Sequence, residues 1–319
     1  MEYLTNFSNI FTMLYENNSK NDNFFSLDGN IYENKTKNDF FSLDGNNTNF
    51  STPNFVPSTT PVSSASMFTL GVIGNICAIV VIWRSSDIHK WKAFHRYVFL
   101  LAITDLLGIL LTSPITLYAY VNNREWIGGQ PVCDFFGFQM AFSGLATVLI
   151  AGAMSVDRLM AVYFPYFYTK EIKNIPCRIN YVLCFIWLLS TLVGLSPILG
   201  FGHNKIQFPR TWCFFDIHSD RIEDKIYSSM YASAIILVIL IMAVCNTLVI
   251  IFLKKESLEC TYSNSRKASI CSTKSSRKKN DRYIIIFLVA IFVVFGACWT
   301  PFTVSCCRHR IQFQYSHIN

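Results

Sequence analysis

Charged residues are scarce in this chain of 319 residues: Asp, Glu, Lys and Arg together make up 15% of it, whereas hydrophobic residues make up 52%. The mean hydropathy is positive, at +0.33. An ordinary soluble domain carries a larger charged fraction, so the composition excludes that class. The sequence therefore predicts an all-α protein that lies in a membrane.

Histidine is absent from the long apolar runs, and this absence argues against an enzyme. An intramembrane serine protease would suit such a chain, but it needs a serine nucleophile and a basic partner inside the bundle. Residues 194–197 have proline where the Gly-x-Ser-Gly motif of such a protease has glycine. Relay charges, inverted repeats and a filter, which mark transporters and channels, are not evident either. We expect no enzyme and no cofactor, with a six-span enzyme or transporter as a distant alternative.

A secretory signal peptide is also lacking, because residues 1–10 have no basic region followed by an apolar core. Residues 1–62 are instead rich in Asn, Ser and Thr and contain the string Phe-Phe-Ser-Leu-Asp-Gly-Asn twice. Such a tract buries too little apolar surface to fold, so we expect a disordered extracellular tail rather than a ligand module. Its predicted glycosylation sites are Asn6, Asn17, Asn34, Asn46 and Asn49.

Six apolar runs are long enough to cross a hydrocarbon core of roughly 30 Å. They are expected near residues 63–83, 97–121, 132–164, 179–202, 226–253 and 283–307. The remaining residues 308–319 are too few for a seventh span and are expected to form an atypical short tail. The segment 254–282 is rich in Lys and Arg, which predicts a cytoplasmic loop and an extracellular amino terminus. We read no nucleic-acid role into the net charge of +7.

Two cysteines are predicted to pair. Cys213 lies among aromatic residues in the loop between two apolar runs, and Cys133 opens the third run. A loop on an oxidising face of the membrane can fold back to Cys133 and cover the bundle, so we expect a disulfide between the two.

Polar residues inside the runs mark further candidate sites. Asp105 lies within the second run, where a carboxylate costs roughly 2.5–3.5 kcal/mol and needs a cavity or a partner. Asn75 in the first run is a candidate partner, and a protonated Asp105 with a purely structural role is the alternative. Asp157 and Arg158 stand together at the cytoplasmic end of the third run, where they form either a local ion pair at a helix end or a functional motif.

Residues 298–301, Cys-Trp-Thr-Pro, lie in the sixth run, where Pro301 is expected to kink the helix beside Trp299. Together with Gly74-Asn75, Asp105 and Asp157-Arg158, this string resembles the signatures of rhodopsin-like G-protein-coupled receptors. The resemblance implies a rhodopsin-like bundle with six of the usual seven helices present.

The same resemblance implies roles for these residues. Asn75 and Asp105 would belong to a central polar network that often holds a sodium ion, the only metal we expect. Asp157 would hold Arg158 in the inactive state, and Arg158 would turn to the G protein on activation. Trp299 and Pro301 would form the switch of the sixth helix.

Other strings resemble the prostanoid receptors, a branch of that family. They are residues 104–108, 113–116, 128–133, 154–156, 165–168 and 211–214. The resemblance implies a receptor in the plasma membrane for a prostanoid lipid, with prostaglandin E2 favoured, that acts through the stimulatory heterotrimeric G protein to raise cyclic AMP. Thr116 and Tyr120 would hydrogen-bond the ligand, and Thr211 and Trp212 would close over it.

Two features depart from this pattern. Gly144 stands where similar receptors have a small hydroxyl residue. The family binds the prostanoid carboxylate with an arginine of the seventh span, for which Arg308 and Arg310 are poor substitutes, so we expect a truncated form. An alternative function is therefore a non-signalling variant that associates with full-length receptor copies.

Ser269 in the basic loop is a candidate phosphorylation site.

Overall fold

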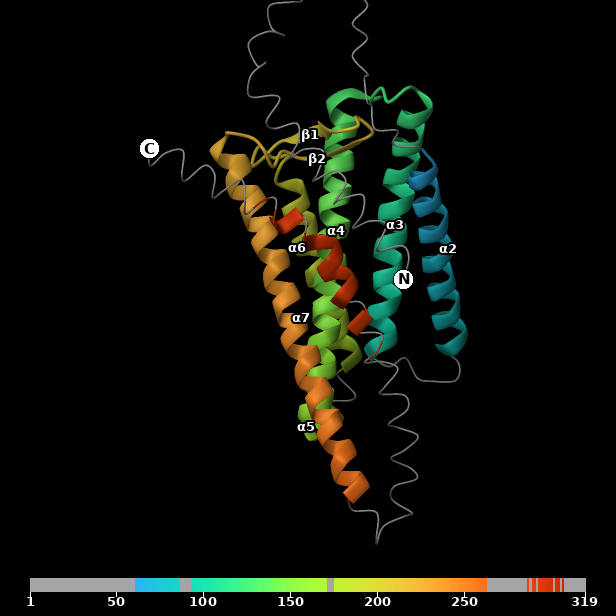
Figure 1. Ribbon diagram of the computed structural model, residues 1–319, viewed down its shortest axis with the longest axis vertical. Helices are drawn as coiled ribbons and strands as arrows, with labels where there is room; N and C mark the ends of the chain where they lie inside the picture. Colours follow the sequence, from blue (N-terminus) through green and yellow to red (C-terminus); the bar gives the residue numbers. More distant parts are fainter. Residues whose placement is uncertain are drawn as a thin grey trace, which may run out of the picture.

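Long helices dominate the molecule, for which a computed structural model describes residues 61–86, 93–170, 175–262, 286, 289–290, 292–300, 302–304 and 306. Within these ranges, five helices are long and apolar enough to cross a membrane. They are α2 (Pro61–Ser86), α3 (Ala93–Val121), α4 (Gly129–Tyr163), α6 (Ile175–Leu195) and α7 (Ile222–Tyr262). The helices lie alongside one another as a bundle (Figure 1), which confirms the predicted all-α membrane class.

α6 ends at Leu195, seven residues before the expected end of its apolar run at residue 202. Pro197 has no N–H to continue the helix, and the amide of Ser196 already bonds to the carbonyl of Val193, at 3.3 Å, in a tighter turn. Gly200 then adopts a φ of 96°, in the left-handed region that favours glycine. The apolar residues after Leu195 therefore belong to a loop and not to the helix.

That loop forms a two-stranded hairpin, which the sequence did not predict. Strand β1 (Asn204–Gln207) pairs antiparallel with β2 (Trp212–Phe215), so that Asn204 lies opposite Phe215. The hairpin lies across one end of the bundle, where α4 begins (Figure 1). We call this the hairpin end. The opposite end, where α4 finishes and the short helix α5 (Pro165–Lys170) follows, is called the Arg158 end.

α4 is the central helix of the bundle. It packs against α3, α6, α7 and β2, whereas α2 packs chiefly against α3. Small residues allow this close packing: a Cβ on Gly152 would lie 2.6 Å from the Val238 side chain of α7. The polar residues that α4 carries are therefore held in the interior, where the candidate site has to be sought.

The expected sixth span is described only in part. Residues 292–300 and 302–304 are helical, whereas Pro301 lies outside the described residues. The predicted sites at Ser269, Arg308 and Arg310 also lie outside them, as do the five glycosylation sites of residues 1–60.

Candidate functional site

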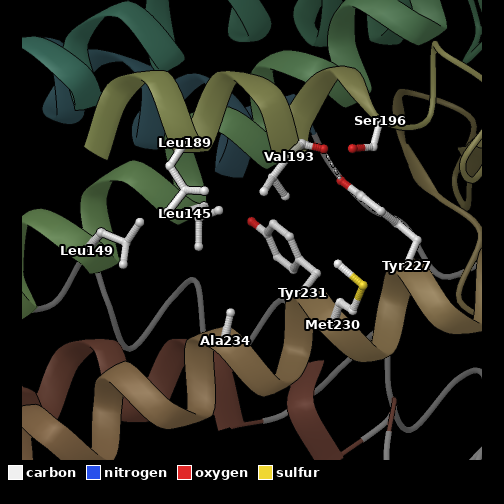
Figure 2. Close-up of a pocket in the computed structure, with 9 residues that line it drawn as sticks. All are labelled: Leu145, Leu149, Leu189, Val193, Ser196, Tyr227, Met230, Tyr231 and Ala234. Atoms are coloured by element: carbon white, nitrogen blue, oxygen red, sulfur yellow. Dashed lines mark hydrogen bonds between the residues drawn. The ribbon is translucent and has the colours of Figure 1, made fainter. Parts of the chain in front are cut away.

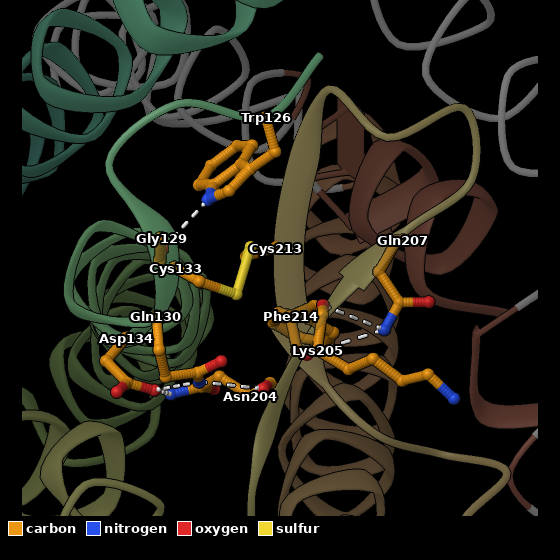
Figure 3. The surroundings of a disulfide bond; sticks show 10 residues. All are labelled: Trp126, Gly129, Gln130, Cys133, Asp134, Asn204, Lys205, Gln207, Cys213 and Phe214. Atoms are coloured by element: carbon orange, nitrogen blue, oxygen red, sulfur yellow. Dashed lines mark hydrogen bonds between the residues drawn. A yellow bond between two sulfur atoms is a disulfide. The ribbon is translucent and has the colours of Figure 1, made fainter. Parts of the chain in front are cut away.

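A disulfide fixes the hairpin to α4. Cys133, in the second turn of α4, is bonded to Cys213 of β2, and both residues are fully buried. Figure 3 shows this bond between the helix and the strand. The predicted pairing is confirmed, and the hairpin is held covalently over the end of the bundle.

Hydrogen bonds add a second attachment beside the disulfide (Figure 3). The side-chain amide of Gln130 donates to the carboxylate of Asp134, at 3.0 Å, and to the backbone carbonyl of Asn204, at 3.1 Å. Asn204 in turn donates to Asp134, at 3.1 Å. A Cβ on Gly137 would lie 2.4 Å from the Asn204 side-chain oxygen, so the strand approaches α4 this closely only because residue 137 is glycine.

Aromatic side chains of the hairpin fill the bundle beneath it. Phe214 and Phe215 are buried and lie 4.1 Å apart between ring centroids. Phe215 also contacts Tyr231 of α7, at 5.2 Å, and Phe302, at 5.9 Å. Phe302 contacts Trp299, at 5.7 Å, so a continuous series of ring contacts joins the hairpin to the predicted switch tryptophan.

Gly144 of α4 makes room for that tryptophan. A Cβ at this position would lie 2.9 Å from the Trp299 ring and 3.0 Å from the Tyr231 hydroxyl. The Tyr231 hydroxyl donates to the carbonyl of Ala141, at 3.1 Å, which fixes the ring against α4. Glycine is therefore required at position 144 for this packing, because a larger residue would displace one of the two rings.

The four predicted ligand residues come from two elements. Thr211 is buried in the hairpin, and Trp212 is partly buried with its indole N–H donated to the Phe208 carbonyl, at 2.8 Å. Thr116 and Tyr120 lie on α3 and are partly buried, and the Thr116 hydroxyl donates to the Thr112 carbonyl, at 3.4 Å. Trp212 and Ile115, the neighbour of Thr116, pack against one cluster formed by Cys133, Phe136 and Cys213.

An apolar cavity of about 170 Å³ lies between α4, α6 and α7, near the aromatic side chains (Figure 2). Tyr227 lines it, with its hydroxyl donated to the Val193 carbonyl, at 3.0 Å. An engineered apolar cavity of about 150 Å³ binds benzene, so this space fits a small apolar group rather than a whole twenty-carbon acid. The lining residues do not include Thr116, Tyr120, Thr211 or Trp212.

Asp105 of α3 finds its partner on α4. The hydroxyl of Thr147 donates to the Asp105 carboxylate, at 2.7 Å. Asn75, the expected partner, instead donates to the carbonyl of Gly71 in its own helix, at 3.0 Å. The expectation is corrected accordingly: α4, which also packs against α3, supplies the hydroxyl that bonds Asp105. Carboxylate and hydroxyl oxygens are the kind of ligand that hard cations bind, and a sodium ion here stays a prediction.

Asp157 holds Arg158 at the other end of α4. The Arg158 guanidinium donates to the buried Asp157 carboxylate, at 2.8 Å, and lies 5.7 Å above the Phe94 ring of α3. The hydroxyl of Tyr168, on α5, also donates to Asp157, at 3.3 Å. Burial and the negative charge of Asp157 raise the pKa of Tyr168, so its hydroxyl keeps its proton. The ion pair is therefore enclosed by three segments of the chain.

Several residues that build these sites could not be assigned a role from the sequence. Thr147 stands in an ordinary helical sequence, and Tyr168 belongs to the string 165–168 that resembles the prostanoid receptors, but only the packing around α4 shows what the two hydroxyl groups contact. Phe215 and Tyr231 could have been recognised from the sequence, because aromatic residues are dense around Cys213 and in the following apolar run. The importance of Gly137 can be recognised only when the strand that packs against it is known.

Comparison with known proteins agrees with this architecture. The family model described as 7 transmembrane receptor (rhodopsin family) matches residues 74–318, more than half of the chain. The chain therefore belongs to the rhodopsin family of seven-transmembrane receptors. Its fold is also similar to the crystal structure of squid rhodopsin, with a TM-score of 0.60 over 79% of this chain and 75% of that one, at 17% sequence identity.

Its curated relatives include several prostanoid receptors. The chain is 38% identical to the rabbit (Oryctolagus cuniculus) prostaglandin E2 receptor EP4 subtype over 58% of this chain and 37% of the relative. It is 30% identical to the rabbit EP3 subtype over 74% and 59%, and 32% identical to the mouse (Mus musculus) prostacyclin receptor over 76% and 57%. The predicted resemblance to the prostanoid receptors is confirmed, although the chain spans less than two thirds of each relative.

Proposed function

We propose that this chain acts as a prostanoid receptor, with prostaglandin E2 as its ligand, and couples to the stimulatory G protein to raise cyclic AMP. The observation that carries the proposal is the disulfide-bonded hairpin, which presents Thr211 and Trp212 at one end of a rhodopsin-like bundle. Similarity to prostaglandin E2 receptors supports the choice of ligand.

The proposed ligand site lies between α3 and the hairpin. Thr116 and Tyr120 supply hydroxyl groups from α3, and Thr211 and Trp212 close over the ligand from β2 and the preceding turn. The shared packing of Ile115 and Trp212 against the disulfide cluster supports this arrangement. A twenty-carbon acid needs a mostly apolar site with a few such donors.

The proposed signalling site is the Arg158 end. Asp157, which accepts a hydrogen bond from Tyr168, holds Arg158 in an ion pair, and release of that pair would let Arg158 reach a G protein. Trp299 would transmit a ligand-induced shift from the hairpin end through the ring contacts. The plasma membrane, the extracellular glycosylated amino terminus and a role for Ser269 belong to the same proposal. Association with other receptor copies stays a prediction.

Saturation binding of radiolabelled prostaglandin E2 to membranes that carry this chain tests the ligand site. Tyr120→Phe and Thr211→Ala should each weaken binding about two- to tenfold, which corresponds to one lost hydrogen bond. Tyr118→Phe is the matched control, because Tyr118 lies on the same helix but is 57% exposed. Unchanged affinity in both variants, at equal surface level, would refute the site assignment. No saturable binding by the unmodified chain would refute the proposed ligand.

A further inference from the structure

A groove of about 720 Å³ lies between α3 and α6, away from the proposed ligand site. Arg96, near the start of α3, and Asn180, near the start of α6, line one end of it, and Trp187 lines it farther along α6. Both helices start at the Arg158 end (Figure 1). The groove therefore runs from that end of the bundle toward its middle.

The groove faces the surroundings of the bundle and not its interior. On α6, Phe185 is 63% exposed and Leu188 is 58% exposed, while Asn180 and Cys184 in the groove are exposed as well. Since α3 and α6 are both membrane-spanning by length and composition, a molecule that enters the groove comes from the lipid phase.

Arg96 gives one end of the groove a positive charge. Its guanidinium donates to the side-chain oxygen of Asn180, at 2.9 Å, which ties the two helices together and fixes the position of the charge. Among the lining residues in the part of the chain that the structure describes, Arg96 is the only charged one. A guanidinium matches the geometry of a phosphate group, which it can bind through two N–H donors at once.

The remaining wall is apolar and held in place. Leu183 is 6% exposed and Phe99 is partly buried. The indole N–H of Trp187 donates to the hydroxyl of Thr104, at 3.2 Å, and that hydroxyl donates to the Leu100 carbonyl, at 2.8 Å. The polar atom of Trp187 is thus satisfied inside the protein, and the rest of the indole offers apolar surface to the groove.

We infer that this groove binds an anionic phospholipid, with the phosphate on Arg96 and an acyl chain along Phe99, Leu183 and Trp187. The Arg158 end is the one that the Lys and Arg distribution predicts to be cytoplasmic. The cytoplasmic leaflet is the one rich in anionic lipids, and basic pockets between spanning helices bind their head groups. The inference does not depend on which ligand the hairpin end binds.

Native mass spectrometry of the purified chain tests this site. The chain is mixed with equal amounts of phosphatidylserine and phosphatidylcholine that carry the same acyl chains, and the two bound lipids are quantified. Retained phosphatidylserine should exceed phosphatidylcholine. Arg96→Gln should weaken phosphatidylserine retention about fivefold, the effect of one basic residue near a charged membrane surface. Arg84→Gln is the matched control, because it removes an exposed charge at the same end of α2.

A second variant tests the acyl wall without altering charge. Cys184→Trp places a large side chain in the groove from an exposed position, so the fold should tolerate it and retention of phosphatidylserine should fall.

An equal loss for Arg84→Gln and Arg96→Gln would overturn the inference in favour of general surface charge. Equal retention of the two lipids, or displacement of phosphatidylserine by cholesterol, would overturn it in favour of a neutral or sterol site.

Discussion

The hairpin end and the Arg158 end of α4 are held by different kinds of contact. At the hairpin end, a disulfide and a cluster of buried aromatic rings fix β2 against the bundle. At the Arg158 end, an ion pair, a tyrosine hydrogen bond and a contact between a guanidinium and a ring hold the helices together. The contacts at the hairpin end are a covalent bond and close packing of rings, whereas those at the Arg158 end are polar contacts that can exchange partners.

This difference matches two tasks of a receptor. Recognition of a ligand benefits from a shape that persists, because little conformational entropy is then lost on binding. Signalling needs an element with two arrangements of similar free energy, which a change of partner at Arg158 can supply. The contrast predicts that substitutions at the hairpin end chiefly affect stability and binding, whereas substitutions at the Arg158 end also affect basal activity.

Removal of the disulfide should have the largest effect. Cys133→Ser should lower the free energy of unfolding by about 2–5 kcal/mol and reduce surface expression, because the hairpin loses its covalent attachment. Thermal unfolding of the purified chain in detergent and cell-surface labelling measure the two effects. Cys184→Ser serves as the control, since this thiol is exposed and outside the disulfide. Full retention of stability and surface expression in Cys133→Ser would contradict the assigned role.

Neutralising Asp157 tests the polar contacts at the Arg158 end of α4. Asp157→Asn should lower the free energy of unfolding by about 1.5–3 kcal/mol, because a charge-assisted hydrogen bond to Arg158 is lost. It should also raise basal cyclic AMP in cells. Asp220→Asn is the control, because Asp220 is 93% exposed and its contact with Lys225 should matter little. A less stable Asp157→Asn variant with unchanged basal cyclic AMP would limit Asp157 to a structural role.

Gly137→Ala should loosen the hairpin without touching the disulfide. The new methyl group would collide with the Asn204 side chain, so we expect a loss of about 1–3 kcal/mol in the free energy of unfolding. Gly74→Ala in α2 is the matched control, because a Cβ there meets nothing within 4 Å. Equal unfolding temperatures for the two variants would show that the close approach of β1 to α4 is not required.

Tyr168→Phe should have the smallest effect, about 0.5–1.5 kcal/mol at neutral pH, since it removes one hydrogen bond to Asp157. The folded-state pKa of Tyr168 is raised, so its contribution to stability is present at neutral pH and is lost as the pH rises above about 10, the ordinary tyrosine pKa. The difference from Tyr168→Phe should therefore shrink at alkaline pH. Tyr181→Phe, at a position 76% exposed, is the control. A difference that does not change with pH would exclude the Tyr168 titration.

The sequence predicted the membrane class, the disulfide and the family because each rests on a local pattern. Apolar run length predicts a spanning helix, and Cys133 and Cys213 stand at positions that invite pairing across one face of the membrane. The end of α6 was predicted less well, because apolar residues continue past Leu195 into the loop, and only Pro197 indicates the stop.

The contacts between side chains on different helices could not be predicted from the sequence. Asp105 needed a polar partner, but the choice of Thr147 over Asn75 depends on how the side chains of neighbouring helices face one another, and run length carries no such information. The hairpin and its approach to Gly137 were missed for the same reason, since both depend on contacts between residues far apart in the chain.

The most direct test of the account is the cyclic AMP response to prostaglandin E2 in cells that express this chain, with Arg158→Ala measured beside it at equal surface level. The account predicts a concentration-dependent rise for the unmodified chain and loss of that rise in Arg158→Ala, whose hairpin end is unchanged. A response of the unmodified chain no larger than that of untransfected cells would contradict the proposed coupling. An undiminished response of Arg158→Ala would contradict the role assigned to the Arg158 end.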